Sequence, residues 1–254
     1  MPDLTDRLTR ESELDADLQI AFKKQKKRVL QAGFGSFIDW SEFQAKIGGA
    51  FRKHLGSTFG VASKNMLKQH TNSKEEELAL LLFLIGQDDV WASGVSDILS
   101  SDTVVNSQRE MQKARERARK AADGAETTAD AVRRETNAWR DLIDTIFGKK
   151  RTEVISATET TRTVTKGEDA GRLIIETITG RRIVAIWMTE VQQFGTDPPI
   201  GPPPPYGVCP ICLPLHRKEE NEWPIEYRAG PPSPHPNCRC YLDYRVLSGP
   251  EYGR

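Results

Sequence analysis

The sequence predicts an α+β protein, in which a mainly α-helical N-terminal region precedes a small C-terminal module. This module is expected to contain a short antiparallel sheet and a Cys/His knuckle. Three observations lead to this fold class. The chain has 15 prolines, of which 13 lie between Pro198 and Pro236, and residues 3–197 contain none. All four cysteines follow residue 208. Two β-branched and aromatic segments, 182–189 and 241–246, lie on either side of the cysteines.

The proline-free part of the chain is predicted to be helical. Proline in a helix interior costs about 3 kcal/mol, and this stretch is rich in the good helix formers Ala, Leu, Glu, Lys and Arg. Apolar residues recur at helical spacing, and Ser73 with Glu76 three residues later has the pattern of a capping box. The expected helices cover residues 3–32, 41–55, 73–85 with an extension towards 99, 105–147 with an interruption near 124, 153–165 and 169–179.

The C-terminal segments have the period of strands. Residues 182–189 read RIVAIWMT and residues 241–246 read YLDYRV, and both are rich in β-branched or aromatic side chains. We expect them to pair across the cysteine region. The predicted domains are therefore a helical arm at 1–148 and a module at 149–254, with the knuckle at 209–240.

Five side chains of the tail are candidate metal ligands. A Cys-x-x-Cys pair lets two thiolates reach one ion from a tight turn, and a second Cys/His cluster about 25 residues later can complete a tetrahedron. Zinc suits such mixed sulfur and nitrogen ligands. The segment has too few large apolar side chains to order by burial, and a structural zinc supplies on the order of 10 kcal/mol. Five donors compete for four positions, and the sequence leaves open which one is omitted: Cys209, Cys212, His235, Cys238 and Cys240.

Other states of the cysteines remain open. Disulfides are the first alternative, although the N-terminus has no apolar signal region and a chain made in the cytoplasm rarely carries them. Reduced cysteines that only pack are the second. A redox centre fits less well because the Cys-x-x-Cys pair does not open a helix. His216 is expected to be a solvated loop residue.

Composition excludes several classes of protein. Lys and Arg together number 36 and Asp and Glu also number 36, so the net charge is zero and a chain that coats nucleic acid is not expected. The longest apolar run, 78–85, is shorter than the roughly 20 residues of a membrane helix, and we expect a soluble protein with no membrane partner. A local DNA contact stays open at one basic cluster, which consists of Lys23, Lys24, Lys26, Lys27 and Arg28.

The last hundred residues carry an ordered series of motifs. Thr158-Glu159 opens the series, Gly171-Arg172-Leu173 follows, and Trp187-Met188-Thr189 ends the first predicted strand. CPIC at 209–212 and HPNCRC at 235–240 complete it. In this order the motifs resemble the phage head morphogenesis family, the minor capsid proteins similar to the F protein of phage Mu. The resemblance covers about residues 150–246. The segment 192–206 departs from it, being longer and carrying four prolines at 202–205.

The resemblance implies a minor structural protein of a tailed-phage head and not an enzyme. Such proteins assemble in the procapsid near the portal vertex, and some influence DNA packaging or delivery. The implied partners are the portal protein and a major capsid or scaffolding protein. The implied locations are the virion and, during assembly, the host cytoplasm.

Two other functions stay open from the sequence. One is an adaptor that binds nucleic acid or protein and is stabilised by zinc, for which the Cys/His knuckle at 209–240 would be sufficient. A metal-dependent nuclease of the HNH type would need catalytic histidines beside the metal fold, and here His235 is expected to serve the metal or the core. Glu159 has no second acid, nucleophile or base at a fixed offset. A helix-capping role, or an ion pair with Arg162 or with an arginine of the tail, is expected instead.

Overall fold

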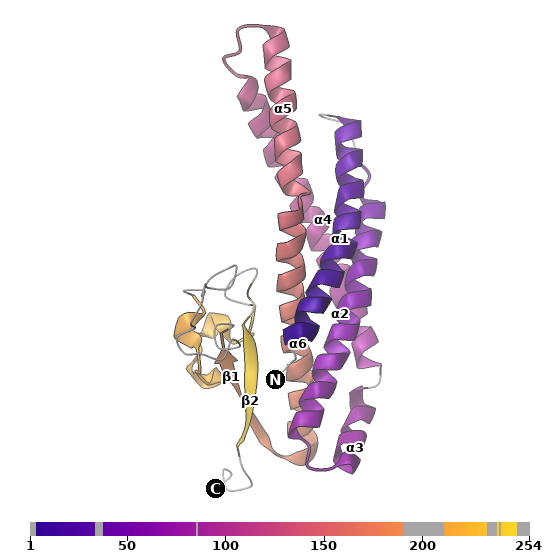
Figure 1. Cartoon of the computed structure of the whole chain (residues 1–254), viewed down its shortest axis with the longest axis vertical. Helices are drawn as coiled ribbons and strands as arrows, with labels where there is room; N and C mark the ends of the chain where they lie inside the picture. The colour runs from indigo at the N-terminus through magenta and orange to yellow at the C-terminus, as the bar shows by residue number, and fades with distance from the viewer. Residues whose placement is uncertain are drawn as a thin grey trace. The chain divides into compact units, whose positions relative to one another are not determined.

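The computed structural model describes residues 4–33, 38–84, 86–189, 211–232, 238 and 240–247. This part of the chain is mostly helical, with a small two-stranded antiparallel sheet near the C-terminus and a cysteine cluster in the same region, which confirms the predicted fold class. Figure 1 labels the elements. The helices are α1 (Leu4–Ala32), α2 (Ser41–His70), α3 (Lys74–Leu84), α4 (Gln87–Ala122), α5 (Thr128–Ile146) and α6 (Lys149–Thr179), and the strands are β1 (Arg182–Met188) and β2 (Tyr241–Leu247).

Local sequence signals set several helix ends. The Ser73 hydroxyl accepts from the backbone N–H of Glu76 at 3.1 Å, which confirms the N-terminal cap of α3. Gly124, with a φ of +73°, lies in the turn between α4 and α5, where the sequence predicted an interruption. The predicted helix 41–55 was too short, because α2 continues to His70.

Helix α6 is longer than the sequence predicted. The two expected helices at 153–165 and 169–179 form one element of 31 residues that passes through Gly167. A Cβ at Gly167 would lie 2.6 Å from the carbonyl oxygen of Phe59, so the glycine permits the close approach of α2. The Ser63 hydroxyl donates to the Gly167 carbonyl at 2.8 Å and strengthens this contact. Glycine here serves helix packing instead of ending a helix.

The two strands pair over their full lengths. Arg182 is opposite Leu247, and Met188 is opposite Tyr241, in an antiparallel register. This confirms the expected pairing across the cysteine region. The end of β1 therefore lies beside the start of β2, where Cys240 immediately precedes the strand.

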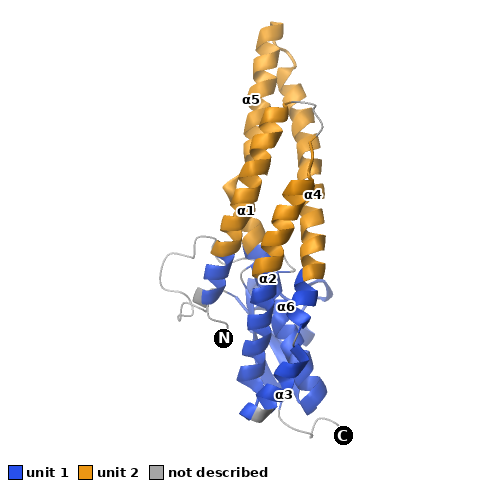
Figure 2. Ribbon diagram, turned by 90° about the vertical axis from the view of Figure 1, so that its right-hand side faces the viewer, with its two compact units in different colours: residues 1–11, 55–92, 157–254 blue, residues 12–54, 93–156 orange. Residues whose placement is uncertain are grey.

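The chain divides into two compact units built from interleaved segments (Figure 2). Unit 1 contains residues 1–11, 55–92 and 157–254, and unit 2 contains residues 12–54 and 93–156. The helices α1, α2, α4 and α6 each contribute residues to both units. The predicted boundary at residue 148 divides the chain only once, and it stays a prediction.

Each unit has its own core. In unit 1, α3 packs its buried leucines Leu80 and Leu84 into a cluster with Met66, Ile175 and Ile183. In unit 2, the ring centroids of Phe22 and Phe43 lie 5.2 Å apart in an edge-to-face contact. Burial of aromatic and aliphatic side chains of this kind stabilises the helical part of each unit.

The segment Glu76–Ala122, which spans α3 and α4, is long and apolar enough by length and composition alone to cross a membrane, which by itself is weak evidence for a membrane span. Core helices of soluble proteins meet the same criterion, but they do so with most of their residues buried. Only 18% of the most apolar window of this stretch is buried. The expectation that the chain has no membrane partner stays a prediction.

Candidate metal centre

The sheet supplies the frame of the candidate centre. Trp187 of β1 is opposite Leu242 of β2, and both side chains are buried. Cys238 and Cys240 precede β2 and are also buried. The register therefore brings both cysteines to the end of β1 that carries the Trp-x-Thr motif.

Backbone hydrogen bonds attach the third cysteine to the same strand. The Arg217 N–H donates to the Trp187 carbonyl at 2.7 Å, and the Trp187 N–H donates to the Lys218 carbonyl at 2.9 Å. A short 3₁₀ helix, η2 (Leu213–Leu215), lies just before this contact, and Cys212 is its N-cap. Cys212 is thus held next to β1, although 25 residues separate it from Cys238 in the sequence.

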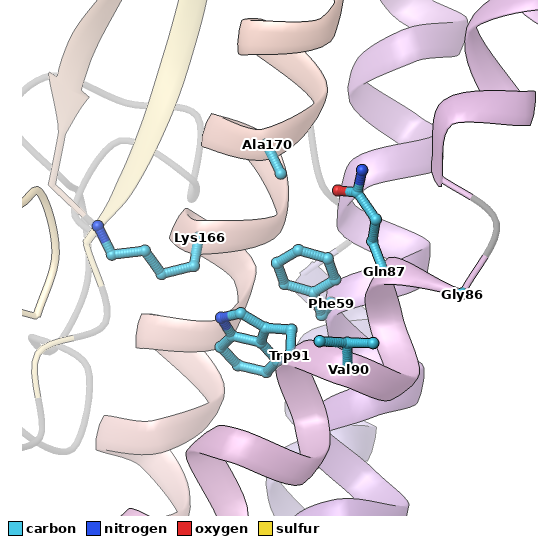
Figure 3. A pocket seen from close by; sticks show the side chains of 7 residues that line it. All are labelled: Phe59, Gly86, Gln87, Val90, Trp91, Lys166 and Ala170. Carbon is cyan, nitrogen blue, oxygen red and sulfur yellow. The ribbon is translucent and has the colours of Figure 1, made fainter.

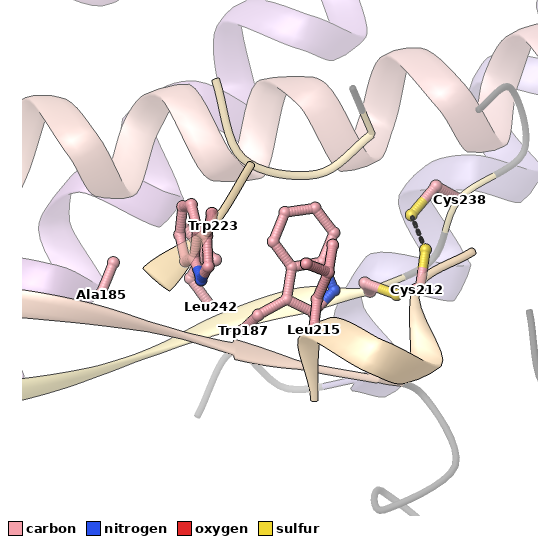
Figure 4. Packing of buried hydrophobic residues seen from close by; sticks show 8 residues of the cluster. Ala185, Trp187, Cys212, Leu215, Trp223, Cys238 and Leu242 are labelled. Atoms are coloured by element: carbon pink, nitrogen blue, oxygen red, sulfur yellow. Dashed lines mark hydrogen bonds between the residues drawn. The ribbon is translucent and has the colours of Figure 1, made fainter. Parts of the chain in front are cut away.

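The three thiols converge in one buried cluster, of which Figure 4 labels Cys212 and Cys238. The sulfur atoms of Cys212 and Cys238 lie 3.8 Å apart, and those of Cys212, Cys238 and Cys240 all lie within 4.8 Å of one another. Two thiolates on a tetrahedral zinc, each about 2.3 Å from the metal, lie about 3.8 Å apart. The three cysteines are free and not joined by disulfides. They can hold a metal ion.

The surroundings of Cys212 and Cys238 favour the protonated thiols over the thiolates. Side-chain hydrogen bonds with Cys238 and Cys240, together with burial, raise the pKa of Cys212 far above its ordinary value. Adjacent thiolates repel one another, so a second negative charge in the cluster is unfavourable. A bound cation removes this penalty, and its binding must therefore release protons.

An apolar shell surrounds the sulfur atoms. Cys212, Cys238 and Cys240 belong to the same buried cluster as Trp187 and Trp223, whose rings meet edge to face at 5.2 Å. Figure 4 shows Trp223 next to Trp187, with Trp187 on the side of the cysteine pair. A shell of this kind excludes water from the sulfur atoms and favours a structural site over one that needs an open ligand position.

No family model, curated protein or solved structure matches this chain. Of the five predicted ligands, the structure brings together Cys212, Cys238 and Cys240. Cys209 and His235 lie outside the described residues, as do the four prolines at 202–205.

Thr189 and His216 form a contact that the sequence did not predict. The backbone N–H of Thr189 donates to Nδ1 of His216 at 3.1 Å, and the Thr189 hydroxyl lies 3.0 Å from the same nitrogen. Thr189 is buried and His216 is half-buried, so the prediction of a solvated loop histidine was wrong. Through these contacts with Thr189, the imidazole of His216 links the loop after Cys212 to the end of β1.

An ion pair joins helix α6 to the cysteine-bearing segment. Arg172 donates to Glu220 at 2.6 Å, and Glu220 lies in η3 (Glu220–Glu222), between Cys212 and Cys238 in the sequence. Arg162 donates to Glu159 at 2.6 Å, which confirms the ion pair expected for this buried glutamate. These contacts give the Thr-Glu and Gly-Arg-Leu segments structural roles.

Ion pairs engage most of the basic cluster on α1. Lys24 and Arg28 both bind Glu42, and Lys26 binds Asp144 at 2.8 Å. Within the described ranges, only Lys23 and Lys27 of the five cations have no ion-pair partner. A DNA contact through this cluster would have to rely on these two lysines or break existing pairs.

Proposed function

We propose that the protein is a minor structural and assembly component of a tailed-phage head, with a C-terminal module fastened by zinc. The observation that carries the proposal is the convergence of Cys212, Cys238 and Cys240 beside the Trp-x-Thr end of β1. Arg172 contributes to this module through its ion pair with Glu220, and Trp187 packs in the same buried cluster as the three cysteines. These residues belong to motifs on which the resemblance to head morphogenesis proteins rests.

Zinc is the proposed ion because three thiolates at tetrahedral spacing favour it over hard cations, which prefer oxygen ligands. The fourth ligand would come from Cys209 or His235. When bound, the ion supplies a crosslink between the segment after residue 210 and the start of β2. The surrounding residues orient the thiols and keep water away from them.

Metal analysis of the purified full-length chain tests the zinc site. We expect about one zinc per chain, lost in the variants Cys212→Ser and Cys238→Ser. The matched control is Ile211→Ser, since Ile211 precedes Cys212 and its side chain is 44% exposed. Chelation of the wild type should also make the chain protease-sensitive after about residue 190. An ordered tail without metal in both cysteine variants would contradict the site.

A separate experiment tests the role in the phage head. In the phage or prophage that carries the gene, we expect the protein in purified particles at low copy number and defective heads after deletion. Complementation with Cys212→Ser should fail, whereas Ile211→Ser should restore assembly. Normal infectious particles after deletion, with the protein absent from wild-type particles, would favour an adaptor that functions in the cell.

A nuclease assay tests the enzyme alternative. The metal-ligand cluster found in the described part of the chain contains only cysteines, and His216 is engaged by Thr189. A nuclease needs a general base and an activated water in addition to a closed structural site. We therefore expect no cleavage of plasmid DNA in the presence of Mg²⁺, Mn²⁺ or Zn²⁺. Cleavage that Cys212→Ser abolishes would support the enzyme instead.

A further inference from the structure

An apolar surface on α3 and the start of α4 has no covering partner among the described residues. Leu78, Leu82, Phe83 and Val90 are each more than half exposed, and Val90 reaches 76%. The opposite side of α3 is also apolar, because Leu80 and Leu84 lie in the core of unit 1. A helix that is apolar on both sides is normally buried on both sides. We call the four exposed residues the α3–α4 patch.

Val90 also lines a groove next to the turn between α3 and α4 (Figure 3). The groove has a volume of about 790 Å³. Its aromatic residues are Phe59 and Trp91, whose rings stack with centroids 4.6 Å apart. Lys166 and Gln87 provide polar groups at its margin. A groove of this size and lining accepts an apolar side chain from a partner.

Acidic residues interrupt the patch in the sequence. Asp88 and Asp89 separate Leu78, Leu82 and Phe83 from Val90 in the sequence. Asp89 is exposed, whereas Asp88 is half-buried near Gly60 of α2, and no ion pair of either aspartate with a described residue is found. Two carboxylates in the middle of the segment make insertion into a bilayer unfavourable, at several kcal/mol. The charge favours a partner that presents apolar side chains on either side of basic ones.

Helix α1 carries such a stripe. Ile20, Lys23, Lys27 and Leu30 follow one another at helical spacing, and all four side chains are exposed. Ile20 is 64% exposed and lines a second groove, of about 550 Å³, together with Phe147 and three lysines. The two lysines flanked by apolar residues on this face of α1 are complementary in charge to the two aspartates that lie between the apolar residues of the α3–α4 segment in the sequence.

We propose that the α3–α4 patch binds the α1 stripe of a second copy of this chain. The patch belongs to unit 1 and the stripe to unit 2, so the two surfaces of one interface are different. Such heterologous contacts repeat from copy to copy and generate rings or open filaments. This inference does not depend on zinc or on the phage role.

Sedimentation velocity of the full-length protein over a concentration series tests the proposal. Wild type is expected to self-associate, and Lys23→Glu/Lys27→Glu and Asp88→Asn/Asp89→Lys are each expected to weaken association at least about tenfold. Combining all four changes in one chain restores opposite charges and should restore association. The matched control is Arg117→Glu/Lys120→Glu, which changes the charge of two exposed residues elsewhere on α4. Circular dichroism of each variant verifies that it is folded.

Three outcomes would overturn the proposal. One is a wild type that stays monomeric throughout the series. Another is a combined charge variant that remains dissociated although it is folded. The third is association that persists in Val90→Glu. Binding of wild type to phosphatidylcholine vesicles, lost in Val90→Glu without self-association, would assign the patch to lipid. Loss of duplex DNA binding in Lys23→Glu/Lys27→Glu, with self-association unchanged, would assign the lysines to DNA.

Discussion

Arg172 of α6 and Glu220 of η3 form an ion pair of 2.6 Å that joins a long helix to the cysteine-bearing segment. Asp169 lies one turn earlier on α6, with its carboxylate 3.7 Å from the same guanidinium. The positive charge of Arg172 therefore offsets the negative charges of Asp169 and Glu220, where α6 contacts the cysteine-bearing segment. Its loss would leave both acids without this cation in a partly buried environment.

We expect Arg172→Met to lower the free energy of unfolding by about 1–3 kcal/mol, because methionine keeps much of the aliphatic stem but donates no hydrogen bond. Urea denaturation at neutral pH measures the effect. Arg228→Met is the matched control, since Arg228 is exposed and should change stability by less than about 0.5 kcal/mol. If both variants lose the same amount, the pair contributes nothing specific.

Glu168 should make stability depend on pH. Burial, followed by repulsion from Asp169, raises the pKa of Glu168 from an ordinary 4.5 to about 8, and the Tyr244 hydroxyl lies 3.4 Å from the carboxylate. Between these two pH values the folded chain holds a proton that the unfolded chain has released. The free energy of unfolding should therefore fall as the pH rises from 4.5 to about 8, by an amount on the order of a few kcal/mol.

Glu168→Gln provides the comparison. The amide is neutral at every pH, so the variant should show a flatter profile over the same window and greater relative stability near pH 8. Thermal unfolding at closely spaced pH values measures both profiles. Parallel profiles for the two proteins would show that Glu168 ionises normally in the folded chain.

The sequence predicted the fold class because its strongest signals are local. The capping box at Ser73, the interruption near Gly124 and the change of period at residue 182 each depend on neighbouring residues, and each lies at an element boundary of the structure. The error at α6 had a tertiary origin. Glycine in a sequence usually indicates the end of a helix. At Gly167, however, the backbone of α2 lies so close that only glycine, which has no Cβ, fits inside the helix without a clash.

The candidate site was predictable only in part for a similar reason. Cysteine spacing identified Cys212, Cys238 and Cys240, since metal ligands are chemically distinctive and clustered in sequence. The contact between Thr189 and His216 spans 27 residues and depends on how the loop folds back on β1. No spacing rule links a threonine at a strand end to a histidine in a distant turn. The pair between Arg172 and Glu220 spans 48 residues and was missed for the same reason.

Thr189→Val tests the contribution of the contact with His216. Valine keeps the shape of threonine but removes the hydroxyl, which lies 3.0 Å from Nδ1 of His216 in a buried position. We expect a loss of about 1 kcal/mol in the free energy of unfolding, with a smaller loss when His216 is already alanine. A double-mutant cycle by urea denaturation measures this coupling. Strictly additive losses would mean that the hydroxyl and the imidazole do not interact.

Gly167→Ala should disturb the packing of α6 on α2. The new methyl group would lie 2.6 Å from the Phe59 carbonyl oxygen and 2.8 Å from Cβ of Ala62, so backbone atoms have to move. We expect a loss of about 1–3 kcal/mol, although alanine is intrinsically the better helix former. Gly94→Ala in α4 is the matched control, because no atom lies within 4 Å of its added Cβ, and it should stabilise the protein by about 0.5–1 kcal/mol. Thermal unfolding should therefore show a lower midpoint temperature for Gly167→Ala and a higher one for Gly94→Ala. If Gly167→Ala raises the midpoint temperature, α6 and α2 do not approach this closely in solution.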